Sequence, residues 1–333
     1  MANFNIPAPR ISGFDAARAS IMVAALLVFN VIAALRLVPG VHTILNGFIW
    51  LIAPMLLTLV PAFFVVAGYL ASSLLMRAKP RGYLISRAKR LVPLLALAGV
   101  AGALTNNWLH LLPIWYLVPC SLLAVTLSSI SRRVSFAVRS RISAYTNLLS
   151  FGPIAVGVYG VLIAAAVGAF WGTKLPTRET SDFSLAYSWQ LAVYAYLAFS
   201  LGWILQRSGS TALKKLANCA LIYLCLGGAL MGAASSLPTF LVIPTAITAG
   251  IYFAFAIVGG FLALCSKQIR VYKYLADSGM WVYSLQPILT TVLLGVLAPT
   301  PAFLGATLLA FATYQFVIRK TVLGRILAGR RRV

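Results

Sequence analysis

Acidic side chains are scarce in this chain of 333 residues, which holds 4 Asp and Glu against 27 Lys and Arg. So few carboxylates leave little to couple transport to protons, which argues against an ion-driven transporter. Histidine is rarer still, with 2 residues, and the 4 cysteines form no CxxC pair. Neither a metal site nor a disulfide framework is therefore expected.

Hydrophobic residues, by contrast, make up 61% of the chain, and only 9% of the residues are charged. A soluble domain of this size does not have such a composition. Repeated apolar runs of about 20 residues predict an all-α fold, a polytopic membrane helix bundle that forms a single domain over residues 1–333. About ten transmembrane helices are expected, at roughly 17–37, 45–75, 83–104, 113–130, 147–171, 185–205, 216–234, 239–265, 278–298 and 301–319.

The basic residues test this division into spans. With the N-terminus in the cytoplasm, all Lys and Arg fall on the cytoplasmic side except Arg36, Lys174 and Arg178. This bias predicts that both termini are cytoplasmic and that the chain is a multi-pass protein of the cytoplasmic (inner) membrane. The basic residues that give the chain its net charge of +23 lie beside apolar spans. They therefore favour contact with membrane lipids and not with nucleic acid.

The stretch Arg10 to Asn30, RISGFDAARASIMVAALLVFN, combines a charged start with an apolar helix. Asp15 and Arg18 are three residues apart and so share one helical face. Asn30 lies about 18 Å further along the axis, near the middle of a bilayer. A polar group at that depth suggests a functional site. The alternative is that Asn30 only forms a hydrogen bond with a neighbouring helix.

Two arginines mark the start of the third span, in GYLISRAKRLVP. Arg87 and Arg90 share a helical face, and guanidinium groups suit bidentate contacts with phosphate. They predict a site for a phosphorylated cytoplasmic ligand. The alternative is that both side chains snorkel to the membrane surface. Just before them, Gly68 predicts a close approach between helices.

Two further groups could line a pocket. His110 and Trp115, in LHLLPIWYLV, fall on the outer side, where they form either an aromatic belt or a sugar pocket. Tyr283 and Gln286, in KYLADSGMWVYSLQPIL, are three apart and can face inward together. In the same segment, Asp277 is expected to cap a helix that begins at about Ser278.

These segments resemble, in order, the motifs of the integral-membrane acyltransferase-3 family, which O-acylates cell-surface glycans. RISGFDAARASIMVAALLVFN resembles its first helix, with D-x-x-R followed by an apolar run ending in His. PAFFVVAGYL resembles its FF-x-x-SGF segment, and YLISRAKRLVP its R-x-x-R-hydrophobic-x-P segment. HLLPIWYL, FSLGWILQ and YLADSGMWVYSLQPIL resemble three later motifs, so the match spans nearly the whole chain.

The resemblance implies an acyltransferase that uses acyl-CoA, most simply acetyl-CoA, as co-substrate and needs no metal. The acyl group would pass to a hydroxyl of an extracytoplasmic glycan or lipid-linked saccharide. Arg18, Arg87 and Arg90 would contact the anionic donor.

The acceptor pocket would contain the aromatic and polar residues His110, Trp115, Tyr283 and Gln286.

The chain departs from the family where the catalytic base is expected. The histidine of the first helix is replaced by Phe29 or Asn30, and a later histidine is Gln286. Neither Asn nor Gln can accept a proton near neutral pH. Two hypotheses remain: another group serves as the base, or the chain is a catalytically degenerate member that binds a lipid-linked sugar, a lipid or a partner protein without turnover.

Overall fold

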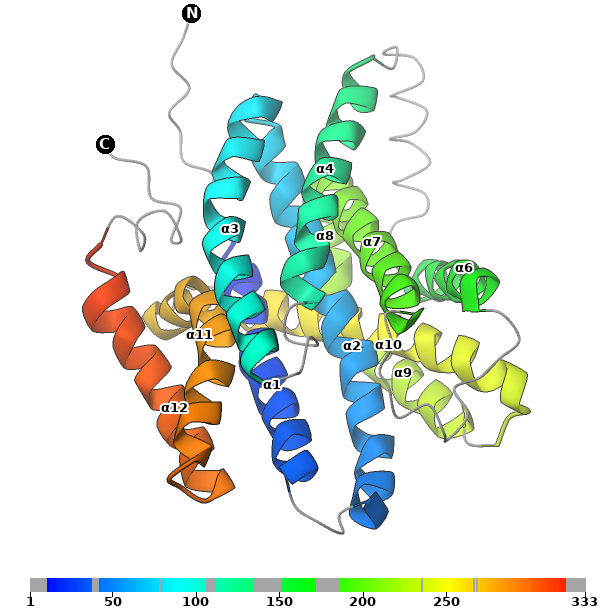
Figure 1. Ribbon diagram of the computed structural model, residues 1–333. Helices are drawn as coiled ribbons and strands as arrows, with labels where there is room; N and C mark the ends of the chain where they lie inside the picture. The colour runs from blue at the N-terminus through cyan, green and yellow to red at the C-terminus, as the bar shows by residue number, and fades with distance from the viewer. Residues whose placement is uncertain are drawn as a thin grey trace, which may run out of the picture.

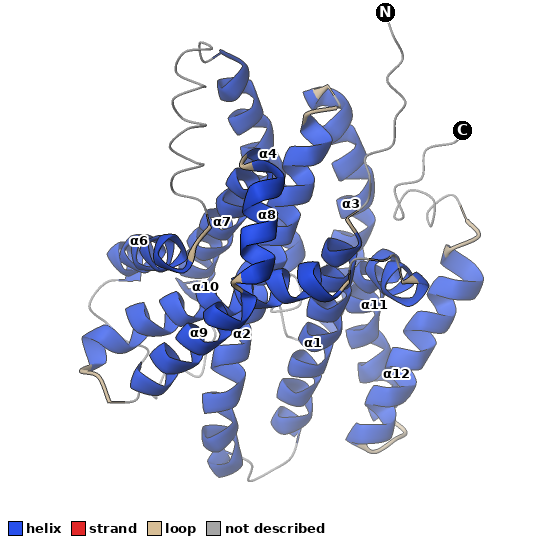
Figure 2. Cartoon of the chain, turned by 180° about the vertical axis from the view of Figure 1, so that it is seen from behind, coloured by secondary structure: helices blue, strands red, loops and turns tan. Residues whose placement is uncertain are grey.

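The computed structural model describes residues 11–37, 42–77, 79–105, 112–133, 151–171, 186–234, 236–265, 267 and 269–321. All regular structure in these ranges is helical (Figures 1 and 2). The first helices are α1 (Ser12–Leu37), α2 (His42–Leu75), α3 (Pro80–Thr105), α4 (Leu112–Arg133), α6 (Pro153–Trp171) and α7 (Ala186–Arg207). They are followed by α8 (Gly209–Asn218), α9 (Ala220–Ala234), α10 (Thr239–Leu264), α11 (Arg270–Leu294), α12 (Pro299–Thr313) and a π-helical turn, η2 (Tyr314–Ile318).

The predicted all-helical architecture is confirmed, and a helix occurs at each predicted span. Within the described residues, four stretches are long and apolar enough to cross a membrane. These are Leu57–Leu75, Pro113–Ser131, Phe240–Leu264 and Thr300–Ile318, and a fifth arises if α8 and α9 count as one span. The chain is therefore an all-helical protein with several helices suited to spanning a bilayer.

Two predicted spans have the wrong boundaries. The run 216–234 is not one straight helix, because α8 ends at Asn218 and α9 leaves it at an angle of 59°. The ninth helix begins at Arg270 and not near Ser278. Asp277 therefore lies two turns inside α11, and the residue at its N-cap is Ile269.

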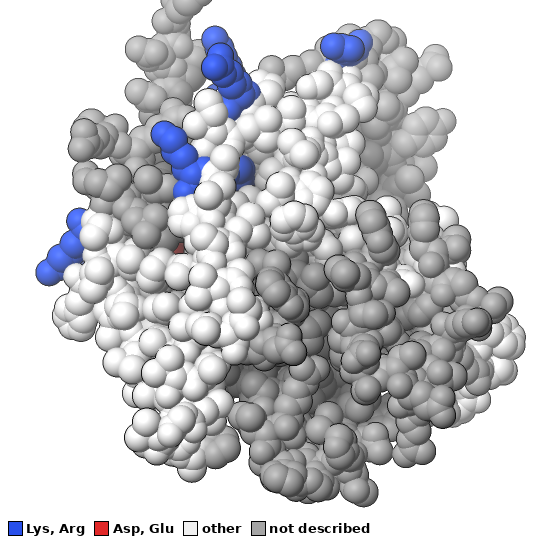
Figure 3. All heavy atoms as spheres, in the orientation of Figure 1, with Lys and Arg blue, Asp and Glu red and all other residues white. Residues whose placement is uncertain are grey.

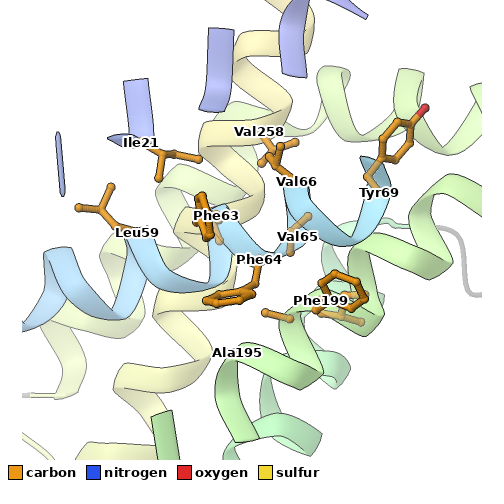
Figure 4. Packing of buried hydrophobic residues seen from close by; sticks show 14 of the residues in the cluster. Ile21, Leu59, Phe63, Phe64, Val65, Val66, Tyr69, Ala195, Phe199 and Val258 are labelled. Atoms are coloured by element: carbon orange, nitrogen blue, oxygen red, sulfur yellow. The ribbon is translucent and has the colours of Figure 1, made fainter. Parts of the chain in front are cut away.

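Helix α2 lies at the centre of the bundle. It packs against α1, α4, α7 and α10. Figure 4 shows how its consecutive side chains from Phe63 to Val66 fill the space between Ile21 of α1, Phe199 of α7 and Val258 of α10. The rings of Phe14 and Tyr69 stack with centroids 4.0 Å apart and join α1 to α2. This core fixes the positions of the helices that form the site.

The surface divides into apolar sides and a basic end. Large apolar side chains are exposed on several helices, including Val92 of α3, Val161 of α6 and Leu308 of α12, each at least 60% exposed. Such surfaces suit contact with lipid. In Figure 3 the visible Lys and Arg lie in the upper half of the molecule, and several of them lie where α2 ends and α3 begins.

Candidate functional site

Arg18 joins α1 to α11 across 258 residues of sequence. Its Nη2 donates a hydrogen bond to the carbonyl of Ala276 and lies 3.8 Å from Oδ1 of Asp277. The two charged side chains are 26% and 11% exposed. A carbonyl oxygen can accept two hydrogen bonds, so the one from Arg18 is compatible with the helical bonding of α11. The arginine is thereby held at a fixed position in the bundle.

Arg18 and Asp277 line a cavity of about 100 Å³, and Arg87 and Arg90 of α3 line it with them. The guanidinium carbon of Arg87 lies 5.2 Å from the centre of the Tyr83 ring. This ring is buried, and a cation over it is favourable. The described lining of this cavity therefore holds three guanidinium groups and one carboxylate, which gives it a net charge of about +2. We call it the basic cavity.

The remaining described wall of the basic cavity is apolar. It is formed by α2, α3, α4 and α11, with Phe63, Leu70, Leu94, Leu117 and Trp281 among the lining residues. Apolar walls exclude water, and in a medium of low dielectric a charged contact is stronger than in bulk water. The basic cavity thus has the properties of an anion site: several guanidinium donors in a partly desolvated pocket.

A second cavity of about 40 Å³ adjoins the first, and the two share Phe63 and Met280 as lining residues. Its described lining is apolar apart from the hydroxyl of Tyr283. We call it the apolar cavity.

The two cavities follow each other along the helix axes. On α1 the lining passes from Arg18 to Ala25, and on α11 from Ala276 to Tyr283. On α2 and α4 the order along the sequence is reversed. The lining residues of all four helices therefore place the apolar cavity on the same side of the basic cavity along the bundle.

The other predicted pocket residues are not gathered at one place. Trp115 is 55% exposed and lines neither cavity. Gln286 is 1% exposed, and its Nε2 donates to Oγ1 of Thr290 at 2.8 Å instead of lining either cavity. Only Tyr283 of the expected acceptor residues lines the apolar cavity. His110 lies outside the described residues.

The position of the missing histidine lies in the second half of α1. The helix continues through Phe29 and Asn30 to Leu37, but both side chains are outside the described part of the structure. The cavities are lined by Arg18 to Ala25 of the same helix. Asn30 is therefore one to two turns beyond the last lining residue of α1.

The two residues predicted to have structural roles are both buried. Asp15 is 8% exposed in the first turn of α1. Gly68 faces α7: a Cβ placed there would be 2.0 Å from the carbonyl oxygen of Phe199. The reciprocal contact is equally tight, since a Cβ at Gly202 would be 1.9 Å from the carbonyl oxygen of Val65. This pair of glycines sets the close crossing of α2 and α7.

Sequence reasoning missed the partner of Arg18 and the residues between the cavities. Asp277 resembled a helix cap, whereas it is the one carboxylate in the described lining of the two cavities. Met280 and Tyr283 follow it at intervals of three residues, so they share its helical face. That spacing could have indicated one continuous lining surface on α11.

Comparisons with protein-family models, curated proteins and solved structures find no match to this chain. What the chain does must therefore be argued from its own residues and cavities.

Proposed function

We propose that this protein is a membrane acyltransferase that moves an acyl group from a cytoplasmic acyl-CoA to a hydroxyl of an extracytoplasmic glycan or lipid-linked saccharide. The observation that carries the proposal is the basic cavity, where Arg18, Arg87 and Arg90 come together from α1 and α3. These arginines are 69 to 72 residues apart in sequence, counted from Arg18. The same three residues match the arginines of the acyltransferase-3 motifs.

Coenzyme A suits this cavity because its phosphates carry several negative charges. Guanidinium groups form charge-assisted, often bidentate hydrogen bonds with phosphate oxygens. Such a bond contributes about 1.5–3 kcal/mol. Arg18 is already held by Ala276 and Asp277, so little side-chain entropy is lost when it meets the ligand.

The proposed topology has ten membrane crossings and both termini in the cytoplasm. It is supported by the distribution of Lys and Arg in the sequence and by their gathering at one end of the visible face (Figure 3). The cytoplasmic (inner) membrane is the proposed location. With this orientation, the basic cavity would lie on the cytoplasmic side, where acyl-CoA is made.

In the proposed reaction, the acceptor hydroxyl oxygen attacks the carbonyl carbon of the thioester. A C–O bond forms and the C–S bond breaks, and the hydroxyl proton ends on the departing thiolate, which gives an ester and free coenzyme A. A general base that relays this proton typically contributes 10²–10⁴-fold. In the described lining, Asp277 is the one carboxylate, and it lies beside Arg18.

The second candidate function is binding without turnover. Two observations favour it: the family histidine is replaced at Phe29 or Asn30, and the described lining of the cavities contains no histidine, cysteine or glutamate. Such a protein would hold an anionic ligand, such as a lipid-linked sugar phosphate, in the same cavity.

Transfer of label from isotope-labelled acetyl-CoA separates the two candidates. Membranes that contain the protein are incubated with the donor, and the glycan and lipid fractions are counted. An acyltransferase labels one fraction, and the double variant R87Q/R90Q loses the label. The control R81Q removes the same kind of charge from an exposed residue in the first turn of α3 and keeps the label.

Absence of label in every fraction would contradict the acyltransferase proposal and favour binding alone. The variant Asn30→His then gives a further test. Acyl transfer gained by this variant would identify the chain as an enzyme that has lost its base.

A further inference from the structure

The C-terminal ends of α2 and α7 lie side by side. The hydroxyl of Tyr194 donates a hydrogen bond to the carbonyl of Leu57, and the hydroxyl of Ser72 donates one to Oε1 of Gln206 at 2.7 Å. Residue numbers rise along both helices from the first contact to the second, so the two helices run in the same direction. They therefore end close together, at Leu75 and Arg207.

Gln206 joins the two ends, and an exposed arginine follows on each side. Its Nε2 donates to Sδ of Met76 at 3.7 Å. Arg77 is the residue after Met76, and Arg207 is the residue after Gln206; both are exposed. The guanidinium carbon of Arg207 lies 5.6 Å from the centre of the Trp203 ring, one turn earlier on α7. Two guanidinium groups from different helices therefore border one place, which we call the α2–α7 junction.

The helices of the junction bring positive charge and no negative charge. The sequences of α2, α7 and α8 contain no Asp or Glu. Beyond Arg207, the exposed side chains of Lys214 and Lys215 on α8 add two further positive charges. A surface with charges of one sign attracts ligands of the opposite sign.

Apolar side chains are exposed beside these arginines. Leu74 is 44% exposed and Met76 is 51% exposed, at the same end of α2 as Arg77. The stretch Leu57–Leu75 is long and apolar enough to cross a membrane, so its end lies where hydrocarbon meets the lipid headgroups. A cationic group beside exposed apolar side chains at that depth matches an amphiphile with an anionic head.

We infer that the α2–α7 junction binds an anionic glycerophospholipid, with its phosphodiester at Arg77 and Arg207 and its acyl chains over Leu74 and Met76. Guanidinium groups form charge-assisted, often bidentate hydrogen bonds with phosphate oxygens. A zwitterionic phospholipid has the same phosphate, but its ammonium group cancels the charge, so the junction holds it more weakly. The binding of this lipid does not depend on the proposed acyl transfer.

The test counts the phospholipids that stay bound to the purified full-length protein, by mass spectrometry of the intact protein from micelles with equal amounts of phosphatidylglycerol and phosphatidylcholine. Each Lys or Arg near a membrane surface contributes about a fivefold gain in affinity for anionic lipid. The wild type should therefore prefer phosphatidylglycerol by about thirtyfold, and R77Q/R207Q should lose this preference. R77K/R207K keeps both charges and should keep most of it.

The double variant R319Q/K320Q is the matched control. Arg319 and Lys320 are also exposed and basic, but they follow η2 and do not lie on α2 or α7. This variant should retain phosphatidylglycerol as the wild type does. An equal loss in R319Q/K320Q and R77Q/R207Q would show that the lipid follows net charge alone, and would overturn the site.

Two other results would also overturn the inference. One is a preference for phosphatidylglycerol that survives unchanged in R77Q/R207Q. The other is displacement of the lipid by excess inorganic phosphate but not by chloride at the same ionic strength, because the junction would then be a site for free phosphate.

Discussion

The charge balance of the basic cavity controls its affinity for an anion, and single substitutions change that balance stepwise. The described lining carries three arginines and one aspartate. Arg87→Gln lowers its net charge to about +1, and Asp277→Asn raises it to about +3, because the substitutions remove charges of opposite sign. Arg18 keeps its hydrogen bond to the carbonyl of Ala276 when Asp277 is neutralised. The guanidinium therefore stays in the cavity.

Coulomb's law gives the size of each step. Two unit charges about 8 Å apart in an effective dielectric of about 20 interact with about 2 kcal/mol. An energy of this size changes a dissociation constant about thirtyfold. We therefore expect coenzyme A to bind Arg87→Gln about thirtyfold more weakly than the wild type, and Asp277→Asn up to thirtyfold more tightly.

The assay is displacement of a labelled coenzyme A from the protein in nanodiscs of zwitterionic lipid. The measurement is repeated at low and high salt, because screening should shrink the differences. Arg81→Gln is the matched control: Arg81 is exposed and is not among the residues that line the cavity. Equal affinities for all variants, or weaker binding by Asp277→Asn than by the wild type, would refute the reasoning.

Three further predictions concern stability and topology. Gly68→Ala puts a Cβ 2.0 Å from a backbone carbonyl, so it should destabilise the bundle by at least about 3 kcal/mol. Gly99→Ala, which meets nothing within 4 Å, should not lower the thermal midpoint in detergent. Tyr194→Phe removes the donor of a 2.7 Å hydrogen bond to a carbonyl of α2 and should cost about 1 kcal/mol in chemical denaturation. In a cysteine-free background, an impermeant maleimide should label Val296→Cys in intact cells and Lys267→Cys only after permeabilisation; the reverse pattern would contradict the proposed topology.

The helices were predictable from the sequence because apolar runs and basic flanks act locally. The run from Phe63 to Leu75 has no charged residue and is apolar apart from Tyr69, Ser72 and Ser73, which is typical of a buried or lipid-facing helix. The break between α8 and α9 was not predictable in the same way. No proline stands at Cys219, where the two helices meet, so no helix breaker marks the bend.

The site was predictable only in part. Arg18, Arg87 and Arg90 were singled out, and the structure brings all three to one cavity. The partner of Arg18 was missed because Asp277 is 259 residues away in sequence. It also precedes Ser278 and an apolar run, which imitates the start of a helix. Its burial inside α11 depends on the ion pair with Arg18, a tertiary contact that no local pattern records.

We propose that the basic cavity holds the phosphates of an acyl-CoA donor. A cryo-electron microscopy map of the protein in nanodiscs, saturated with a non-hydrolysable acetyl-CoA analogue, tests it most directly. Phosphate density is expected within hydrogen-bond distance of the guanidinium groups of Arg18, Arg87 and Arg90. Density for the analogue at any other place, with the basic cavity empty, would contradict it.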